Sequence, residues 1–428
     1  MLYERWRQIA EEHRNEVALH DVALGERWTF AQLAAATEIG SSVAGPVVYP
    51  RGPTAEFIFA VLRGWRSGKV ICPLEIGQSP PAFQRLPADC IHLKTTSATT
   101  GTPRFIAFTD GQLAADAHNI VATMELRPDW PNLGVISLAH SYGFSNLVLP
   151  LLLHGIPLML TGSTLPEMIR SATTLSESLT LAAVPALWRT WHDSGVAPPN
   201  VRLAISAGAP LPLLLERAVF SANGLKIHNF YGSSECGGIA YDTSKIPRND
   251  SACVGSPMQN VSLSVADDGC MEVRSRAVAE GYWWGEAADE PSSEDTRPTN
   301  STLGGGCFRT SDLAEISDGL VYLRGRAGDQ INVAGRKVSP ETIERAVLTN
   351  PQVLECVVFG VPSRDAQRTE EIVAAVVSRE REEILRQFAL ESLPAWQAPR
   401  HWWFVEAVQT NPRGKISRAE WRERWLAR

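Results

Sequence analysis

The feature that most constrains the fold is a regular alternation between residues 134 and 229, where short apolar runs are separated by helix-like stretches. Strands that alternate with helices in this way form parallel sheets covered by helices, and ligands bind at the carboxyl ends of the strands. The alternation therefore predicts an α/β fold. We expect its strands at residues 134–138, 156–160, 181–184, 203–206 and 226–229.

The pattern changes after residue 250. Residues 261–265 and 271–274 alternate between apolar and polar side chains around the turn sequence Asp267-Asp268-Gly269, which is typical of a hairpin. This favours a small β subdomain at about residues 250–325. Residues 285–306 are polar and rich in proline, serine and glycine, so we expect a surface loop there.

The last hundred residues carry strand and helix signals of their own. Ser339 and Pro340 are typical of the start of a helix, with the serine hydroxyl as its cap, and residues 353–361 and 372–377 indicate strands. A chain of 428 residues also exceeds the size of a single hydrophobic core. We expect a large N-terminal domain at residues 1–327 and a small, mobile α+β domain at residues 328–428.

Composition excludes several classes of protein. The net charge is −7 and lysine and arginine form no long run, which argues against nucleic acid as a partner. The first residues are charged, and no apolar stretch is long enough to span a membrane, so we expect a cytoplasmic protein. Seven scattered cysteines without a CxxC pair argue against a disulfide framework and a zinc site.

The most informative segment is TTSATTGTPR at residues 95–104, which follows an expected strand at residues 90–94. A loop of hydroxyl and small side chains can turn several N–H and O–H groups onto one anion, as phosphate-binding loops do. The Walker spacing GxxxxGKS/T is absent. Taken alone, the segment fits a polar surface turn equally well.

Five motifs in this chain resemble, in order, those of the adenylate-forming superfamily, which contains acyl-CoA synthetases, aryl-CoA ligases, firefly luciferase and peptide-synthetase adenylation domains. TSATTGTPR is similar to the phosphate loop S/T-S-G-S/T-T-G-x-P-K, and YGSSE at residues 231–235 to YGxTE. The other three are FRTSD at residues 308–312, similar to TGD, GRAGDQINVAG at residues 325–335, similar to GRxxDxIxxxG, and PRGK at residues 412–415, similar to PxGK. Together they cover essentially the whole chain.

This resemblance implies a reaction in which a carboxylate attacks the α-phosphate of ATP and pyrophosphate leaves, so that negative charge must be neutralised. It implies that Lys415 bridges the carboxylate and the α-phosphate, and that Glu235 holds Mg²⁺. Asp312 would accept the ribose hydroxyls, with Arg326 beside it. The phosphate cradle would comprise Thr96, Ser97, Thr99, Thr100 and Gly101, of which Thr100 acts in catalysis with Glu235 and Lys415.

The resemblance also implies where the other substrates bind. The adenine side of the site would comprise Gly208, Ala209, Pro210, Tyr231, Gly232 and Ser234, with the tyrosine stacked on the base. The acid pocket would comprise His140, Phe144, Ala207, Phe230, Gly237 and Ile239. Gly328 occupies the position of the family's hinge, and Gly335 that of the glycine beside which a pantetheine arm passes.

Substrate class follows from the segment at residues 137–145. Family members that activate amino acids generally carry an aspartate there, and this segment has none, which favours a carboxylic acid without an α-amino group. Whether its acyl part is aromatic or an alkyl chain stays open, and His140 also fits a core histidine.

Only about two dozen residues separate the segment at 68–74 from the phosphate loop, fewer than in most relatives, so we expect a trimmed N-terminal domain.

Three readings of function follow. The first is an AMP-forming ligase that passes the acyl group to coenzyme A, and the second delivers it to the phosphopantetheine of an acyl carrier protein. The third is a non-catalytic acyl- or nucleotide-binding relative, supported only by Ala98, Arg104 and Ser311, which depart from the family motifs. A dehydrogenase is disfavoured because no GxGxxG follows the first strand.

Overall fold

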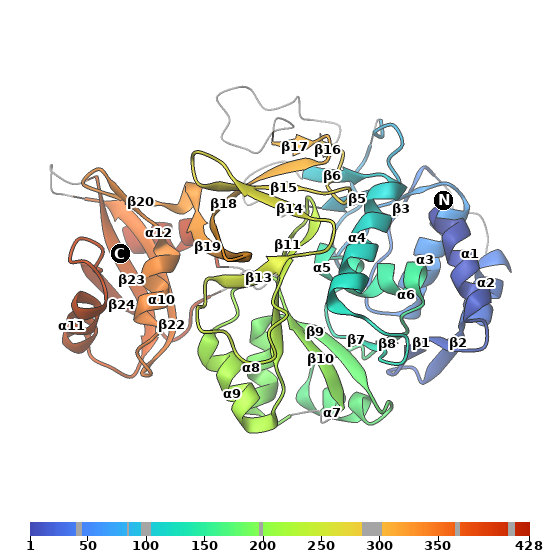
Figure 1. Ribbon diagram of the computed structural model, residues 1–428, viewed down its shortest axis with the longest axis horizontal. Coiled ribbons are helices and arrows are strands. Elements are labelled where there is room, and N and C mark those ends of the chain that lie inside the picture. The colour runs from blue at the N-terminus through green and yellow to red at the C-terminus, as the bar shows by residue number, and fades with distance from the viewer. Residues whose placement is uncertain are drawn as a thin grey trace. The chain divides into compact units, whose positions relative to one another are not determined.

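The computed structural model describes residues 1–39, 45–83, 85–95, 104–196, 200–284, 302–363, 369–409 and 416–428. The chain divides into two compact units, whose helices and strands are drawn in Figure 1. Unit 1 comprises Met1–Asp250, Val254–Ser264 and Glu272–Arg309, and unit 2 comprises Ser251–Cys253, Val265–Met271 and Thr310–Arg428. Sheets and helices alternate as the sequence predicts, so the α/β fold is confirmed.

The main sheet of unit 1 is largely parallel. Within unit 1 its strands follow the order β13-β12-β11-β10-β9-β7-β8-β1-β2, and the strands from β11 to β1 run parallel to their neighbours. Antiparallel hairpin partners extend it at both ends. The strands are β1 (Val17–Asp21), β2 (Glu26–Thr29), β7 (Asn132–Gly134), β8 (Leu158–Leu160), β9 (Leu179–Ala183), β10 (Val201–Ser206), β11 (Ile227–Ser233), β12 (Gly237–Tyr241) and β13 (Cys253–Pro257).

Helices cover this sheet with apolar side chains. In α8 (Pro185–Asp193), Trp188 and Trp191 are almost fully buried, and their rings meet edge to face at a centroid distance of 5.3 Å. Each buried indole N–H donates to a backbone carbonyl, so burial leaves no donor of either tryptophan unpaired. The other helices of unit 1 are α1 (Leu2–Glu12), α2 (Phe30–Ile39), α3 (Ala55–Arg66), α4 (Asp110–Met124), α5 (Ser141–Gly143), the π-helix η1 (Phe144–Val148), α6 (Leu149–His154), α7 (Pro166–Thr173) and α9 (Leu213–Asn223).

A second sheet of unit 1 has the order β16-β6-β5-β4-β3. Its strand β5 ends at Thr95 and its strand β6 begins at Arg104, and the two pair in antiparallel fashion. β16 pairs with the other edge of β6. The strands are β3 (Val47–Val48), β4 (Val70–Ile71), β5 (His92–Thr95), β6 (Arg104–Phe108) and β16 (Gly281–Trp284).

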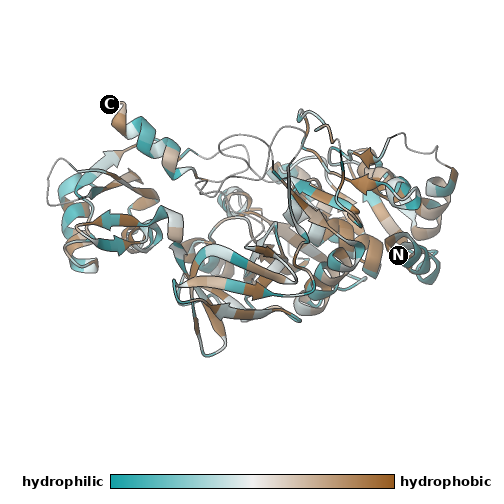
Figure 2. Cartoon of the chain, turned by 90° about the horizontal axis from the view of Figure 1, so that it is seen from above, coloured by the Kyte–Doolittle hydropathy of each residue, from teal (hydrophilic) through white to brown (hydrophobic). Residues whose placement is uncertain are grey.

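Unit 2 has its own apolar cores. One core extends from Ile331 to Trp402, and another packs Trp421 of the last helix against Val357 and neighbouring residues. Most of that last helix has the colours of hydrophilic residues in Figure 2, and Trp421 is the residue that it buries. The elements from residue 320 onward are β19 (Leu320–Arg326), the 3₁₀ turn η2 (Ala327–Asp329), β20 (Ile331–Val333), β21 (Arg336–Val338), α10 (Pro340–Val347), β22 (Val353–Pro362), β23 (Glu370–Ser378), α11 (Glu382–Ser392), β24 (His401–Phe404) and α12 (Arg418–Leu426).

One strand prediction needs correction. The run at residues 134–138 is not a strand beyond Gly134, because the neighbouring strands pair with β7 only up to that residue. Its apolar character reflects burial, since Leu138 is 1% exposed without strand pairing. The region of the expected β subdomain contains the strands β14 (Ser262–Val265), β15 (Cys270–Arg274), β17 (Leu303–Gly304) and β18 (Cys307–Ser317), and its residues are divided between units 1 and 2.

Two further expectations changed in detail. The surface loop expected at residues 285–306 includes β17 at its end, and its residues 285–301 lie outside the part of the chain that the structure describes. Ser339 occupies the cap position of α10, but its hydroxyl makes no capping hydrogen bond, and Pro340 at the first position supplies the start signal instead.

Across the described ranges, no helix combines the length and apolarity that crossing a bilayer requires.

The half-buried His154 makes the fold sensitive to acid. His154 ends α6, and its ring lies 6.1 Å from that of His118. Burial, followed by the neighbouring His118 and Arg5, lowers the pKa of His154 from 6.5 to about 4. Between these values the unfolded chain binds a proton that the folded chain does not, so stability falls as pH falls.

We expect this difference in proton binding at His154 to lower the free energy of unfolding by about 2 kcal/mol between neutral pH and about pH 4. This figure allows for the partial exposure of the ring. Denaturant unfolding of the wild type and of His154→Gln at both pH values measures the effect. The variant should lose less stability on acidification, and equal losses would contradict the assignment.

Candidate active site

The turn that carries Glu235 joins β11 to β12 and is held on several sides. The Glu235 N–H donates to Ser233 Oγ (3.2 Å), and its carbonyl accepts from the Ala279 N–H (2.9 Å). The Tyr282 hydroxyl donates to Glu235 Oε1 (3.1 Å). Burial and the charge of Glu235 raise the pKa of Tyr282, so that hydroxyl keeps its proton and remains a donor. The carboxylate is therefore fixed by its backbone and by one side chain.

Tyr282 also connects this carboxylate with the strand that follows the expected phosphate loop. It lies on β16, opposite Ile106 of β6. The Arg104 guanidinium lies 4.2 Å from the centre of its ring, a cation–π contact. Arg104, which departs from the lysine of the family motif, is thus placed near Glu235 by an aromatic partner. Sequence reasoning missed Tyr282, because the run GYWW matches none of the motifs and does not indicate its distant partners.

The donor set around Glu235 suits Mg²⁺. Within the described ranges, no group of three or more His, Cys, Asp and Glu side chains could enclose a metal ion. Mg²⁺ does not need such a group, because it usually binds one or two carboxylates, waters and the phosphates of a substrate. Glu235 is partly exposed and one of its oxygens accepts from Tyr282, which leaves the second oxygen for a metal.

The segment expected to line the acid pocket lies against the Glu235 hairpin. Ser141 Oγ is 3.0 Å from Ser234 Oγ, and the rings of Tyr142 and Phe230 lie 5.9 Å apart. Ala207 lies close by as well. Its N–H and the Tyr142 hydroxyl both donate to the backbone carbonyl of Ala183. Three distant segments that each carry expected pocket residues are therefore neighbours in unit 1.

Two expected pocket residues have structural roles as well. His140 Nδ1 accepts from the Tyr142 N–H (3.2 Å), so this histidine caps the short helix α5. Phe144 is 1% exposed, and its ring packs against His92 and Phe57. Ile239 is fully buried on β12. Their contact with a bound acid stays a prediction.

The expected adenine side of the site follows the carboxyl ends of β10 and β11, where parallel sheets bind ligands. Gly208 is exposed and has φ +85°, and Pro210 is exposed while Ala209 and Tyr231 are partly exposed. Gly232 is required by packing, since a Cβ there would lie 2.6 Å from the Gly237 carbonyl oxygen. These backbone groups are open to a ligand, and their role in adenine binding stays a prediction.

The remaining expected site residues in the described ranges belong to unit 2. Asp312 Oδ1 accepts from Arg326 Nε (3.0 Å) across the β18–β19 pair, so the two residues are neighbours as expected. Ser311 is exposed. Gly335 and Ala334 form the two-residue turn between β20 and β21, both with positive φ, as such hairpins require. Gly335 thus has a conformational role besides any role in passing a pantetheine arm.

Some expectations fall outside the described part of the chain. These are the phosphate cradle of Thr96, Ser97, Thr99, Thr100 and Gly101, the neighbouring Ala98, and the catalytic candidate Lys415.

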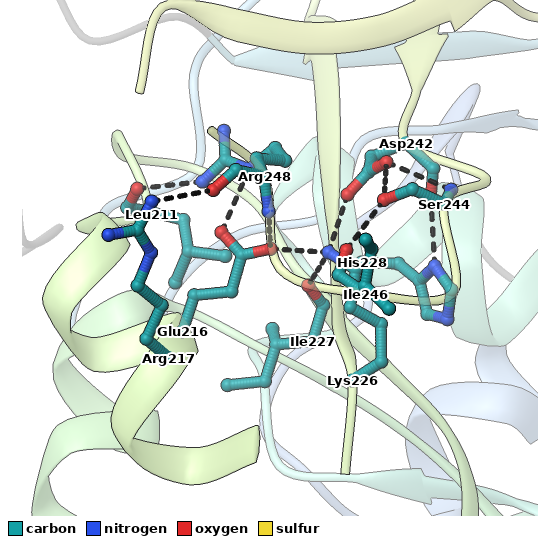
Figure 3. A network of polar contacts seen from close by, with 10 residues as sticks. All are labelled: Leu211, Glu216, Arg217, Lys226, Ile227, His228, Asp242, Ser244, Ile246 and Arg248. Carbon is teal, nitrogen blue, oxygen red and sulfur yellow. Dashed lines mark hydrogen bonds and ion pairs between the residues drawn. The ribbon is translucent and has the colours of Figure 1, made fainter. Parts of the chain in front are cut away.

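A buried polar network connects the two ends of the β11–β12 hairpin (Figure 3). Glu216 of α9 is fully buried and pairs with Lys226 and with Arg248 Nε (2.9 Å). Lys226 also donates to Asp242 Oδ2 (2.6 Å), just beyond β12. Burial tends to raise the pKa of Asp242, but hydrogen bonds from Lys226 and Ser244 outweigh it and hold the pKa below its ordinary value. The network ties both ends of the hairpin to α9.

This chain is similar to known proteins over most of its length. The family model described as AMP-binding enzyme matches residues 52–283, and that described as AMP-binding enzyme C-terminal domain matches residues 342–415. Sulfoacetate–CoA ligase of Cupriavidus necator is 28% identical over 362 residues, which is 79% of this chain and 67% of that protein. Long-chain-fatty-acid–CoA ligase FadD13 of Mycobacterium tuberculosis is 26% identical over 373 residues, 81% of this chain and 70% of that one.

Solved structures show the same fold. ATP-bound MatB from Rhodopseudomonas palustris superposes with a TM-score of 0.85 at 21% identity, covering 99% of both chains. The MenE o-succinylbenzoate CoA synthetase of Bacillus subtilis, solved with its acyl-adenylate intermediate, gives 0.81 at 18% identity and covers 97% of both. Because the first family model alone spans more than half of the sequence, this chain belongs to the AMP-binding enzyme family.

Proposed function

We propose that this protein is an AMP-forming acid:thiol ligase, which adenylates a carboxylic acid with ATP and transfers the acyl group to coenzyme A. The observation that carries this proposal is the placement of Glu235, which is fixed by Tyr282 beside Arg104 at the start of β6. The family match and the relatives named as CoA ligases support the same reaction.

In the first half-reaction a carboxylate oxygen of the acid attacks the α-phosphorus of ATP, and the bond to pyrophosphate breaks. Mg²⁺, when held by Glu235, would neutralise charge on the phosphates. Lys415 would neutralise the charge that develops between the carboxylate and the α-phosphate, and Asp312 would hold the ribose. Arg326 keeps Asp312 in place through the ion pair across β18 and β19.

In the second half-reaction the thiol sulfur attacks the acyl carbon, AMP leaves, and the thiol proton passes to solvent. We place the pantetheine arm beside the β20–β21 turn, where a Cβ built on Gly335 meets no described atom within 4 Å apart from those of its two chain neighbours. A carrier protein's phosphopantetheine would take the same path, so the acceptor must be decided by assay.

The acid is proposed to lack an α-amino group, since residues 137–145 contain no carboxylate to bind an ammonium. ATP–pyrophosphate exchange over aryl, short, medium and long acids and amino acids tests this. We expect exchange with simple acids, and strong exchange with amino acids alone would contradict the substrate class. Thioester assays with coenzyme A and with a holo carrier protein then identify the acceptor, and acyl transfer to neither would refute the ligase proposal.

Gly328 is proposed as the hinge about which residues 328–428 turn between the half-reactions. It lies in the η2 turn just before Ile331, the first residue of the core of unit 2. Gly328→Pro should leave adenylate formation near the wild-type rate if the fixed conformation is the adenylating one, and should slow acyl transfer at least about 10-fold, because proline fixes φ near −65°.

Gly328→Ala is the matched control, because a Cβ at this position meets nothing within 4 Å in the described part of the chain beyond its two chain neighbours. Single-turnover assays of each half-reaction should show that alanine is tolerated and proline is not. Wild-type transfer by Gly328→Pro from preformed acyl adenylate would place the hinge elsewhere.

A further inference from the structure

A buried carboxylate lies beneath the candidate active site and has no assigned role. Asp116 of α4 is 1% exposed and occupies the apolar face of its helix, three residues after Leu113 and next to Ala117, both fully buried. Placing a carboxylate in such surroundings is strongly unfavourable unless it is paired. A position that favours an apolar residue therefore holds a charged one, and its contacts indicate why.

One oxygen of Asp116 joins two segments of the site. Ser145 Oγ donates to Asp116 Oδ2 (2.6 Å), and Lys94 Nζ lies 3.9 Å from the same oxygen. Lys94 also donates to Ser145 Oγ (3.4 Å). Lys94 is the penultimate residue of β5, directly before the expected phosphate loop, and Ser145 follows Phe144 of the expected acid pocket.

The other oxygen holds the Glu235 turn. Asp116 Oδ1 accepts from the Gly238 N–H (3.2 Å). Gly237 has φ +69°, and a Cβ there would lie 1.9 Å from the same carboxylate oxygen. The Asp116 carboxylate is thus packed directly against the backbone of Gly237 and Gly238, two and three residues after Glu235. Any side chain at position 237 would clash with it.

The charge of Lys94 also connects Asp116 with Glu235. Burial lowers the pKa of Lys94, and the neighbouring carboxylates of Asp116 and Glu235 oppose the shift, Asp116 more strongly. Lys94 lies over the ring of Phe108 (4.4 Å), so its ammonium is enclosed on that side by an aromatic face. The carboxylates of Asp116 and Glu235 therefore act on one buried ammonium.

We propose that Asp116 is a positioning residue that fixes the Glu235 turn relative to β5 and to the acid-pocket segment, and so aligns Glu235 with the metal–nucleotide complex. Asp116 does not touch substrate in this proposal. It acts through Gly238 and, by way of Lys94 and Ser145, on the two neighbouring segments. The inference rests on the proposed function, since it assumes that Glu235 binds Mg²⁺ with ATP.

The test compares Asp116→Asn, Glu235→Gln and their double variant in pyrophosphate exchange at varied Mg²⁺ and ATP. Groups that orient a metal ligand typically contribute 10- to 100-fold to metal affinity or activity. We expect Asp116→Asn to raise the Mg²⁺ concentration for half-maximal exchange about 10-fold, and to add little in the Glu235→Gln background. Fully additive effects, or an unchanged Mg²⁺ dependence, would overturn the proposal.

Ser145→Ala is a second, milder variant that keeps the carboxylate and should shift the Mg²⁺ dependence in the same direction by a smaller factor. Its matched control is Thr180→Val on β9, which removes another hydroxyl that is 1% exposed in unit 1. We expect the control to retain the wild-type Mg²⁺ dependence. Equal shifts in both would show that Ser145 acts through general packing.

Binding measured without turnover separates this proposal from the proposed function. Thermal unfolding of the wild type and Asp116→Asn is followed with MgATP and with ATP plus EDTA. We expect the Mg²⁺-dependent stabilisation to be smaller in the variant, and an equal one would contradict a positioning role. A wild type that binds MgATP but exchanges no pyrophosphate would refute the proposed function, and this binding comparison would still decide on Asp116.

Discussion

Replacing Lys415 by alanine should slow acyl-adenylate formation by about 100- to 1,000-fold, the usual effect of removing a group that stabilises charge in a transition state. The proposed reaction brings a carboxylate and a triphosphate together, and a compact ammonium can follow the charge as it develops on the α-phosphate. Transfer from a supplied acyl adenylate should be much less affected, because the α-phosphate bond has already formed.

Single-turnover assays of the two half-reactions measure this separation. Lys245→Ala is the control, since that lysine is exposed in unit 1 and outside the candidate site. Equal damage to both half-reactions in Lys415→Ala would mean that the lysine acts in binding or stability and not at the α-phosphate step.

Replacing Glu216 by alanine should lower the free energy of unfolding by about 3–5 kcal/mol, the usual cost of removing one partner from a buried ion pair. Glu216 is fully buried, and its two oxygens pair with Lys226 and Arg248, which are 8% and 5% exposed. Without the glutamate, the Arg248 guanidinium loses its carboxylate partner and keeps its hydrogen bond to the Leu211 carbonyl (Figure 3). Asp242 compensates only Lys226.

Denaturant unfolding of the purified variant measures this loss. Glu177→Ala removes an exposed carboxylate of unit 1 and should change stability by less than about 0.5 kcal/mol. A loss below about 1 kcal/mol in Glu216→Ala would show that water or another group replaces the carboxylate, and that the network does not hold the hairpin.

Much of the fold could be read from local patterns. The alternation of apolar runs with helical stretches anticipated the strands β8 to β11, because a strand buried on both faces must be apolar whatever its neighbours are. The same reasoning misplaced residues 135–138, since burial alone also produces an apolar run. Apolar composition reports exclusion from water and does not distinguish a paired strand from a buried loop.

The candidate site was anticipated where it depends on motifs. The cross-strand pair of Asp312 and Arg326 could be named before the structure, because both residues stand in short recognisable segments. Tyr282 could not be named in the same way, because its relation to Glu235 arises from the pairing of β16 with β6, strands separated by more than 170 residues. No local pattern records such a distant pairing.

The sequence by itself determined the class of fold, the family and the residue types that adenylation needs, since these depend on local periodicity and on motifs written in consecutive residues. Only the tertiary structure brought Asp116, Lys94 and Ser145 together under the Glu235 turn. A charged residue on an apolar helix face signals that something compensates it, but which group does so is decided by packing. Long-range contacts between buried polar groups are a property of the folded chain, because each acquires its partner only when the intervening segments have folded.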